Sequence, residues 1–278
     1  RAAYDRGAER ADMTRFILNL VERRFRDTTF VQGTVPALQE LQQLSEGWAG
    51  RQSAATLFNA FVALNEAMTY KSSTFPRVHS LYWGVTERLI TRPLVIAPQR
   101  LSAEEEAYFL PYVFNIFTEE ARMDYMDVHG GRGTVDPAVV DQYVRRIHRA
   151  ADLFAQLDAG APMKDFFQRM ALSLRMHASI MRSCGNFAAA QAVRDRNKEV
   201  LTAAPVRPSK ESTWTGHPDF MAFNNIMRDE LDNTRELIEW LEKGGRELLV
   251  LAYDKIYEDR FLLGGDIIEQ LKKKRKIM

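Results

Sequence analysis

Two aspartates, a histidine and an arginine occur within a short segment of this chain, MDYMDVHGGRGTVDP, from Met123 to Pro137. Asp124 and Asp127 are three residues apart, so on a helix they would share one face, and His129 would follow near the helix end. Two carboxylates beside a histidine suit acid–base catalysis. The glycines around Arg132 would present backbone amides and a guanidinium to an anion. The segment is therefore a candidate catalytic or anion-binding site.

The same residues also have a structural interpretation, which we favour. Gly130 can end a helix in the left-handed conformation, and His129 suits the negative end of that helix. Asp136 followed by Pro137 is a helix-start signal. The segment is then a junction between two helices, and Asp124, Asp127 and Arg132 remain the leading site candidates.

Aromatic residues gather beside a carboxylate at a second place, between Asn65 and Arg88. Glu66 is a candidate acid, and His79, Tyr82 and Trp83 are candidate ligand contacts. An aromatic ring beside a carboxylate suits carbohydrate recognition, because the ring covers an apolar sugar face. Aromatic residues with polar tips are also common where two helices pack, and we favour that interpretation.

The longest stretch without periodicity runs from Ala203 to Pro218 and is rich in proline, serine and threonine. Such long connections are uncommon inside compact domains and often carry function. Trp214 and His217 are therefore candidate ligand-binding residues. They are explained equally well as an aromatic anchor for the loop and the entry to a capped helix.

One histidine, His177, lies on an apolar helical face with Met170, Met181 and Cys184. Soft ligands of this kind suit haem or copper. A core histidine hydrogen-bonded to a neighbouring helix is the interpretation we favour, because no paired histidine and no haem-attachment motif accompanies it. Cys184 is the only cysteine, so cysteine-based zinc and iron–sulfur sites are excluded. We expect no metal and no cofactor.

The charge pattern indicates no specialised partner. The 38 basic and 37 acidic residues leave a formal net charge of +1, so no overall field would attract nucleic acid or an anionic membrane. We interpret the acidic run Arg228–Lys243 as solvated helix surface and the basic run Lys272–Lys276 as a helix C-terminus. No apolar run is long enough to span a membrane.

Helical periodicity dominates the chain, which predicts an all-α protein of about ten helices in an irregular multi-helix bundle or α-solenoid-like array. A helix after Pro36 is expected to end at Gly47 and Gly50. A long helix is expected from Pro137 to about Leu157, and another from Pro162 that Gly185 interrupts. Further helices are expected from Asp219 to about Lys243 and after Gly265. We expect an N-terminal helical array over residues 1–204 and C-terminal helices over 219–278. The 205–218 loop joins them, and they pack as one continuous domain.

Several signatures of common enzymes are absent: HExxH, GxSxG, a Walker loop and GxGxxG. The leading hypothesis is a non-catalytic binding or scaffolding domain for a protein or carbohydrate partner, as part of a larger exported bacterial protein. The alternatives are a carbohydrate-active hydrolase using acid–base carboxylates and a cofactor-binding helical bundle, so whether the chain is an enzyme stays open. The soluble chain is expected in the bacterial cytoplasm, or exported with its signal removed, because it begins at Arg1.

Overall fold

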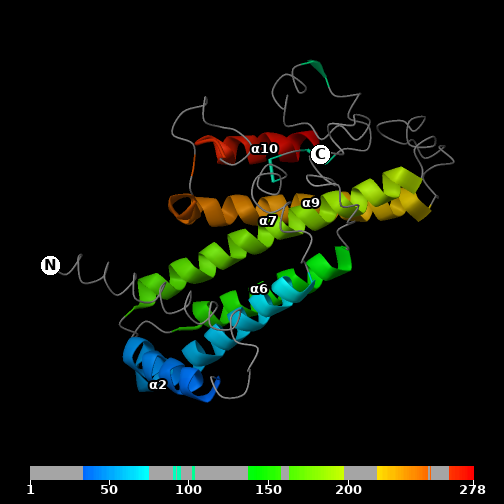
Figure 1. Ribbon diagram of the computed structural model, residues 1–278. Coiled ribbons are helices and arrows are strands. Elements are labelled where there is room, and N and C mark those ends of the chain that lie inside the picture. Colours follow the sequence, from blue (N-terminus) through cyan, green and yellow to red (C-terminus); the bar gives the residue numbers. More distant parts are fainter. Residues whose placement is uncertain are drawn as a thin grey trace. The chain divides into compact units, whose positions relative to one another are not determined.

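The structure is a computed structural model that describes residues 34–74, 90–91, 93–94, 102–103, 137–157, 163–196, 218–249, 251 and 263–278. The ordered elements in these ranges are helical (Figure 1). They are α2 (Thr34–Thr74), α6 (Pro137–Ala155), α7 (Lys164–Arg196), α9 (Pro218–Glu242), the 3-10 helix η3 (Gly245–Leu248) and α10 (Ile267–Ile277). The one extended pairing in these ranges is an isolated bridge between Leu251 and Leu263. The predicted all-α class is confirmed for the described residues.

The predicted number of helices is not supported, because the described residues hold five α-helices. One reason lies in α2, where we expected Gly47 and Gly50 to end a helix. The helix continues through Gly47 and is kinked at Gly50, whose φ of 73° and ψ of 164° are not helical. Glycine adopts such a φ without the steric cost that a side chain would bring. The expected break is therefore a kink within one element.

A second expected break, at Gly185, is wrong. Helix α7 runs through this position without interruption. A Cβ on Gly185 would lie 3.0 Å from Cγ1 of Val140 on α6, so the glycine allows two helices to approach closely. Asn186, which we expected to cap a new helix, instead donates hydrogen bonds to two carboxylates of α9, Asp229 and Glu230.

The chain divides into two compact units. The first consists of Arg1–Phe58 with Leu157–Lys164, and the second of Asn59–Gln156 with Asp165–Met278. Residues 205–217 of the predicted loop lie outside the described residues, and Pro218 is the first residue of α9. The domain division that we based on this loop stays a prediction.

The core of the second unit contains the apolar face of α6. The helical periodicity of the sequence places six apolar residues on that face, and all six are buried: Val140, Tyr143, Val144, Ile147, Ala151 and Phe154. Phe154 packs edge to face on Phe61 of α2, with ring centroids 5.5 Å apart, and stacks with Phe167 of α7 at 6.4 Å. Helices from three parts of the sequence therefore share one aromatic core.

Helices α9 and α10 lie side by side and form a further part of the core (Figure 1). Helix α9 ends before Gly244, which has a left-handed φ of 101°, as we predicted. Helix α10 begins after Gly265 with Asp266 as its N-cap residue, also as predicted. The buried apolar residues of this cluster are Ile90, Met176, Leu237, Ile238, Leu241, Leu263, Ile267 and Leu271.

None of the helices in the described ranges combines the length and the apolarity needed to cross a lipid bilayer.

Candidate functional site

Only one of the candidate residues from the sequence lies in the part of the chain that the structure describes. This residue is Glu66, in the C-terminal half of α2. The remaining candidates lie outside the described residues: His79, Tyr82, Trp83, Asp124, Asp127, His129, Arg132, Trp214 and His217.

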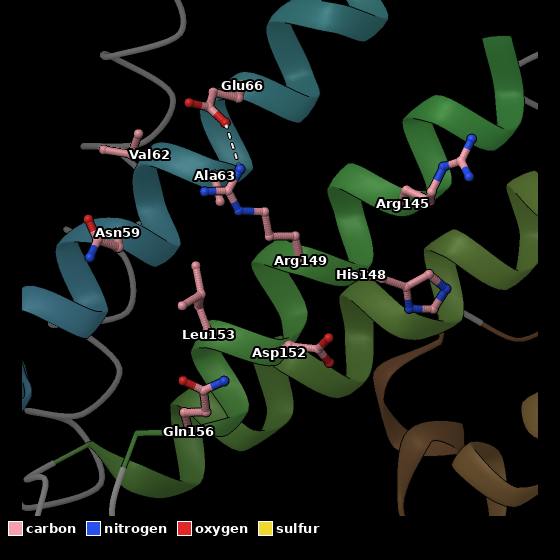
Figure 2. A pocket seen from close by; sticks show the side chains of 10 residues that line it. All are labelled: Asn59, Val62, Ala63, Glu66, Arg145, His148, Arg149, Asp152, Leu153 and Gln156. Carbon is pink, nitrogen blue, oxygen red and sulfur yellow. Dashed lines mark ion pairs between the residues drawn. The ribbon is translucent and has the colours of Figure 1, made fainter.

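Glu66 lines a surface groove between α2 and α6, here called the α2–α6 groove (Figure 2). Its volume is about 630 Å³. The lining residues come from one exposed face of each helix and are Asn59, Val62, Ala63, Glu66, Arg145, His148, Arg149, Asp152, Leu153 and Gln156. Leu153 of α6 points toward α2, and Arg149 reaches toward Glu66 (Figure 2). The groove therefore has apolar side chains between charged ones.

The charged residues of the α2–α6 groove form exposed ion pairs. The Arg149 guanidinium lies 3.8 Å from the Glu66 carboxylate, and the two side chains are 71% and 54% exposed. Arg145 pairs with Asp141 one turn earlier on α6. Exposed pairs of this kind contribute about 0–1 kcal/mol, because water screens both charges. These pairs can therefore exchange partners at little cost.

His148 stands at the side of the groove that faces α9. Its ring centroid lies 6.3 Å from that of Trp240. Burial lowers the pKa of His148 below its usual value, and the nearby carboxylates of Asp152 and Glu236 oppose this change. His148 is therefore neutral at pH 7, and its ring supplies aromatic surface at this end of the groove.

The second histidine that the structure describes in detail, His177, belongs to the helix contacts. Its Nε2 lies 2.9 Å from the hydroxyl of Tyr143 on α6. Burial, followed by the charge of Lys71, lowers the pKa of His177 to about 4. Burial likewise lowers the pKa of Lys71 to about 8. The hydrogen bond to a neighbouring helix is the arrangement that the core interpretation of His177 predicts.

Metal-binding chemistry finds no support within the described ranges. No group of three or more histidine, cysteine, aspartate or glutamate residues there is arranged to hold a metal ion. Cys184 is buried, and burial raises the pKa of its thiol to about 12. A thiol in this state is a poor nucleophile and a poor ligand.

A buried polar network, which the sequence interpretation missed, joins α7, α9 and α10. At its centre the Lys274 ammonium of α10 forms an ion pair with the Glu230 carboxylate of α9, and these side chains are 1% and 0% exposed. Ser183 donates a hydrogen bond of 2.6 Å to Oε1 of Glu230, and Asn186 donates one of 2.8 Å to Oε2. Lys274 also donates to the backbone carbonyl of Ile90, at 2.8 Å.

The network continues along α7 and α9. The Asn233 amide donates to the Ser179 carbonyl and to the Ser183 hydroxyl, at 3.0 Å each. The Ser179 hydroxyl donates back to Oδ1 of Asn233 at 2.6 Å. Nearer the surface, the Arg182 guanidinium binds Asp229 at 2.9 Å and Glu236 at 3.3 Å. Buried polar groups that are hydrogen-bonded in this way specify how two helices pack.

This network corrects one interpretation made from the sequence. The run Arg228–Lys243 is not simply solvated surface, because Glu230 within it is fully buried. The basic run Lys272–Lys276 lies at the C-terminus of α10, as interpreted, but the Lys274 side chain within it is buried. Lys272 in the same run pairs with Glu242 of α9 at 3.2 Å. Both charge runs therefore help to dock α10 on α9.

The first unit has a smaller hollow of about 420 Å³ along α2. Its lining residues repeat at helical spacing along a single helix and are Glu40, Gln43, Leu44, Gly47 and Trp48. It brings together no carboxylate pair and no histidine, so the α2–α6 groove is the better candidate site among the described residues.

Comparison with known proteins adds no identity. No family model, no curated protein and no solved structure matches this chain.

Proposed function

We propose that this chain is a non-catalytic helical binding domain whose α2–α6 groove receives a segment of a partner polypeptide. The observation that carries the proposal is a groove whose lining includes the apolar side chains of Val62 and Leu153 together with charged residues in exposed ion pairs that can exchange. Protein interfaces have this composition, with an apolar centre and a polar rim. The groove thus supplies apolar contact and adjustable polar contact side by side.

The dimensions of the groove favour a polypeptide. Its α6 side runs from Arg145 to Gln156, which is about three helical turns or 16 Å. An extended segment of about five residues, or a helix of about three turns, matches that length.

The charge of the groove favours a partner with charges of both signs. The lining residues include two arginines, Arg145 and Arg149, and two carboxylates, Glu66 and Asp152. The formal charges of this lining cancel, because His148 is neutral at pH 7. A polyanion such as nucleic acid would find no excess of positive charge here.

Selection of peptides from a random displayed library on the full chain tests the proposal. Peptides selected on the wild-type chain are expected to bind the Leu153→Asp variant about tenfold or more weakly, because a carboxylate would replace an apolar contact in the α2–α6 groove. The matched control is Ser173→Asp, which adds the same group at an exposed position of α7 away from the groove. Equal binding to both variants would place the peptide site elsewhere and reject the proposal.

A carbohydrate-active hydrolase is the second candidate, because Glu66 and Asp152 line one groove. Two carboxyl groups across an open cleft are the minimum for acid–base hydrolysis of a glycoside. Each carboxylate already forms an ion pair with an arginine, Glu66 with Arg149 at 3.8 Å and Asp152 with Arg175 at 2.9 Å. Oligosaccharide cleavage by the wild-type chain that disappears in Glu66→Gln would favour this candidate over the binding domain.

A further inference from the structure

Helices α7 and α9 together form a buried polar site beside an apolar cluster. Three side chains make it: Ser183 and Asn186 of α7 and Glu230 of α9, here called the lysine site. Both oxygens of the Glu230 carboxylate have a hydrogen-bond donor from α7. The three side chains of the lysine site therefore come from α7 and α9, and none comes from α10.

Helix α10 places one ammonium group in this site. Ile267, Leu271 and Lys274 repeat at helical spacing, and all three are buried. The two aliphatic side chains pack in the apolar cluster with Leu237 and Leu241 of α9. Lys274 lies on the same face of α10, and its ammonium group occupies the lysine site. There it donates hydrogen bonds to the Glu230 carboxylate and to the Ile90 carbonyl.

We propose that the face of α7 and α9 is a docking surface for an amphipathic helix that carries one lysine on its apolar side, with α10 as its exchangeable intramolecular occupant. A helix as short as α10, Ile267–Ile277, is marginal in water when isolated. Its folding therefore depends on docking. When α10 leaves, Glu230 keeps its hydrogen bonds from Ser183 and Asn186, so the docking surface persists and can accept a second helix of the same kind.

The selectivity for lysine follows from burial. An apolar side chain in place of Lys274 would leave the Glu230 carboxylate buried without a countercharge, which is strongly unfavourable. A lysine on the exposed face of a docking helix, as Lys276 is on α10, would not reach the site. The position of the lysine relative to the two aliphatic side chains therefore decides binding, in addition to its charge.

Exchange is tested with the full chain carrying Leu271→Asp, which removes an apolar anchor of α10 and leaves every residue of the lysine site in place. The probe is a fluorescent synthetic peptide with the sequence of residues 266–278. We expect it to bind this variant at least about tenfold more tightly than a peptide with Lys274→Met, since a hydrogen bond to a charged group is lost. The control peptide carries Lys276→Met and has the same net charge as the Lys274→Met peptide. It is expected to bind like the unmodified peptide.

The wild-type chain provides the comparison, because its own α10 occupies the surface and should weaken binding of the same peptide. Equal affinity of Leu271→Asp for all three peptides, or no binding at all, would overturn the proposal. Should Leu271→Asp unfold the whole chain, hydrogen exchange on the wild type decides. The backbone amides of α10 are expected to exchange their hydrogens through a local opening that leaves α7 and α9 folded. If the α10 amides exchange only when those of α7 and α9 do, the proposal that α10 is an exchangeable occupant is overturned.

Discussion

The ion pair between Glu66 and Arg149 joins α2 and α6 across an open groove, whereas the pair between Glu230 and Lys274 joins α9 and α10 inside the core. The two pairs contain similar groups, a glutamate carboxylate and a basic side chain, but differ in surroundings. Water solvates the first pair. Ser183 and Asn186 replace water around the carboxylate of the second.

This difference in solvation separates a surface suited to binding from a contact that determines packing. Exposed charges can change partners because water stabilises them when they separate. A buried charge has no such compensation when the helix packed on it lacks a countercharge, so the pair selects which helix packs there. We therefore expect changes in the α2–α6 groove to alter binding and changes in the buried network to alter folding.

The largest effect is expected from Lys274→Met. It leaves Glu230 buried and unpaired, which should lower the free energy of unfolding by about 3–5 kcal/mol. Urea denaturation of this variant and of Lys276→Met, an exposed lysine on the same helix, measures the difference. The control should stay within about 0.5 kcal/mol of the wild type. A loss of less than about 1 kcal/mol in Lys274→Met would show that the buried pair is solvated like the exposed one.

A pH-dependent effect of intermediate size is expected from His177. Its pKa in the folded chain is about 4, because burial lowers it from the ordinary histidine value of 6.5. Between these values the unfolded chain binds more protons than the folded chain, so stability falls as pH falls from about 6.5 to 4. The loss attributable to this residue is at most about 3 kcal/mol.

Denaturation at pH 7.5 and pH 4.5 of the wild type and of His177→Gln checks the assignment. Glutamine does not titrate and can still accept a hydrogen bond from Tyr143. The variant should therefore lose less stability than the wild type at the lower pH. The same pH dependence in both proteins would mean that other groups cause it.

The sequence predicted the apolar faces of this molecule better than its polar contacts. The buried face of α6 and the ends of α9 and α10 followed from helical periodicity and from glycine. Glu230 and Lys274 fall on such faces too, since Leu237 and Leu271 lie seven and three residues from them. We assigned the charged run that contains Glu230 to solvent, and we interpreted the run that contains Lys274 only as a helix C-terminus. Their pairing depends on how α10 docks on α9, which periodicity does not specify.

The candidate site was less predictable than the helices. Glu66 was recognised as a candidate, but its neighbours Arg149 and Asp152 lie on a helix far along the sequence, and the arrangement of two helices brings them together. Ordinary exposed charges at helical spacing carry no signal of such a groove. The continuity of α7 through Gly185 was missed for a similar reason, because the close contact with Val140 belongs to another helix.

A smaller effect is expected from Gly185→Ala. The new Cβ would lie 3.0 Å from Val140, a β-branched residue with little freedom to move. The strain should exceed the gain in helix propensity and destabilise the chain by about 1–2 kcal/mol. Gly47→Ala is the matched change within α2, where nothing lies within 4 Å of the added Cβ, and it should stabilise by about 0.5–1 kcal/mol. Thermal unfolding that moves in the same direction for both variants would contradict close packing at Gly185.

The smallest effect on stability is expected in the α2–α6 groove. Arg149→Ala and Glu66→Ala should each change the free energy of unfolding by less than about 1 kcal/mol, because their side chains are mostly solvated. The double variant measures the coupling between them, which should be near zero and weaken further in salt. Peptides selected on the wild-type groove should nevertheless lose affinity for either variant, because a partner would take over one of the two charges. A coupling well above about 1 kcal/mol would mean that the pair is fixed in place, and the groove would then lack the exchangeable charges on which the proposed binding depends.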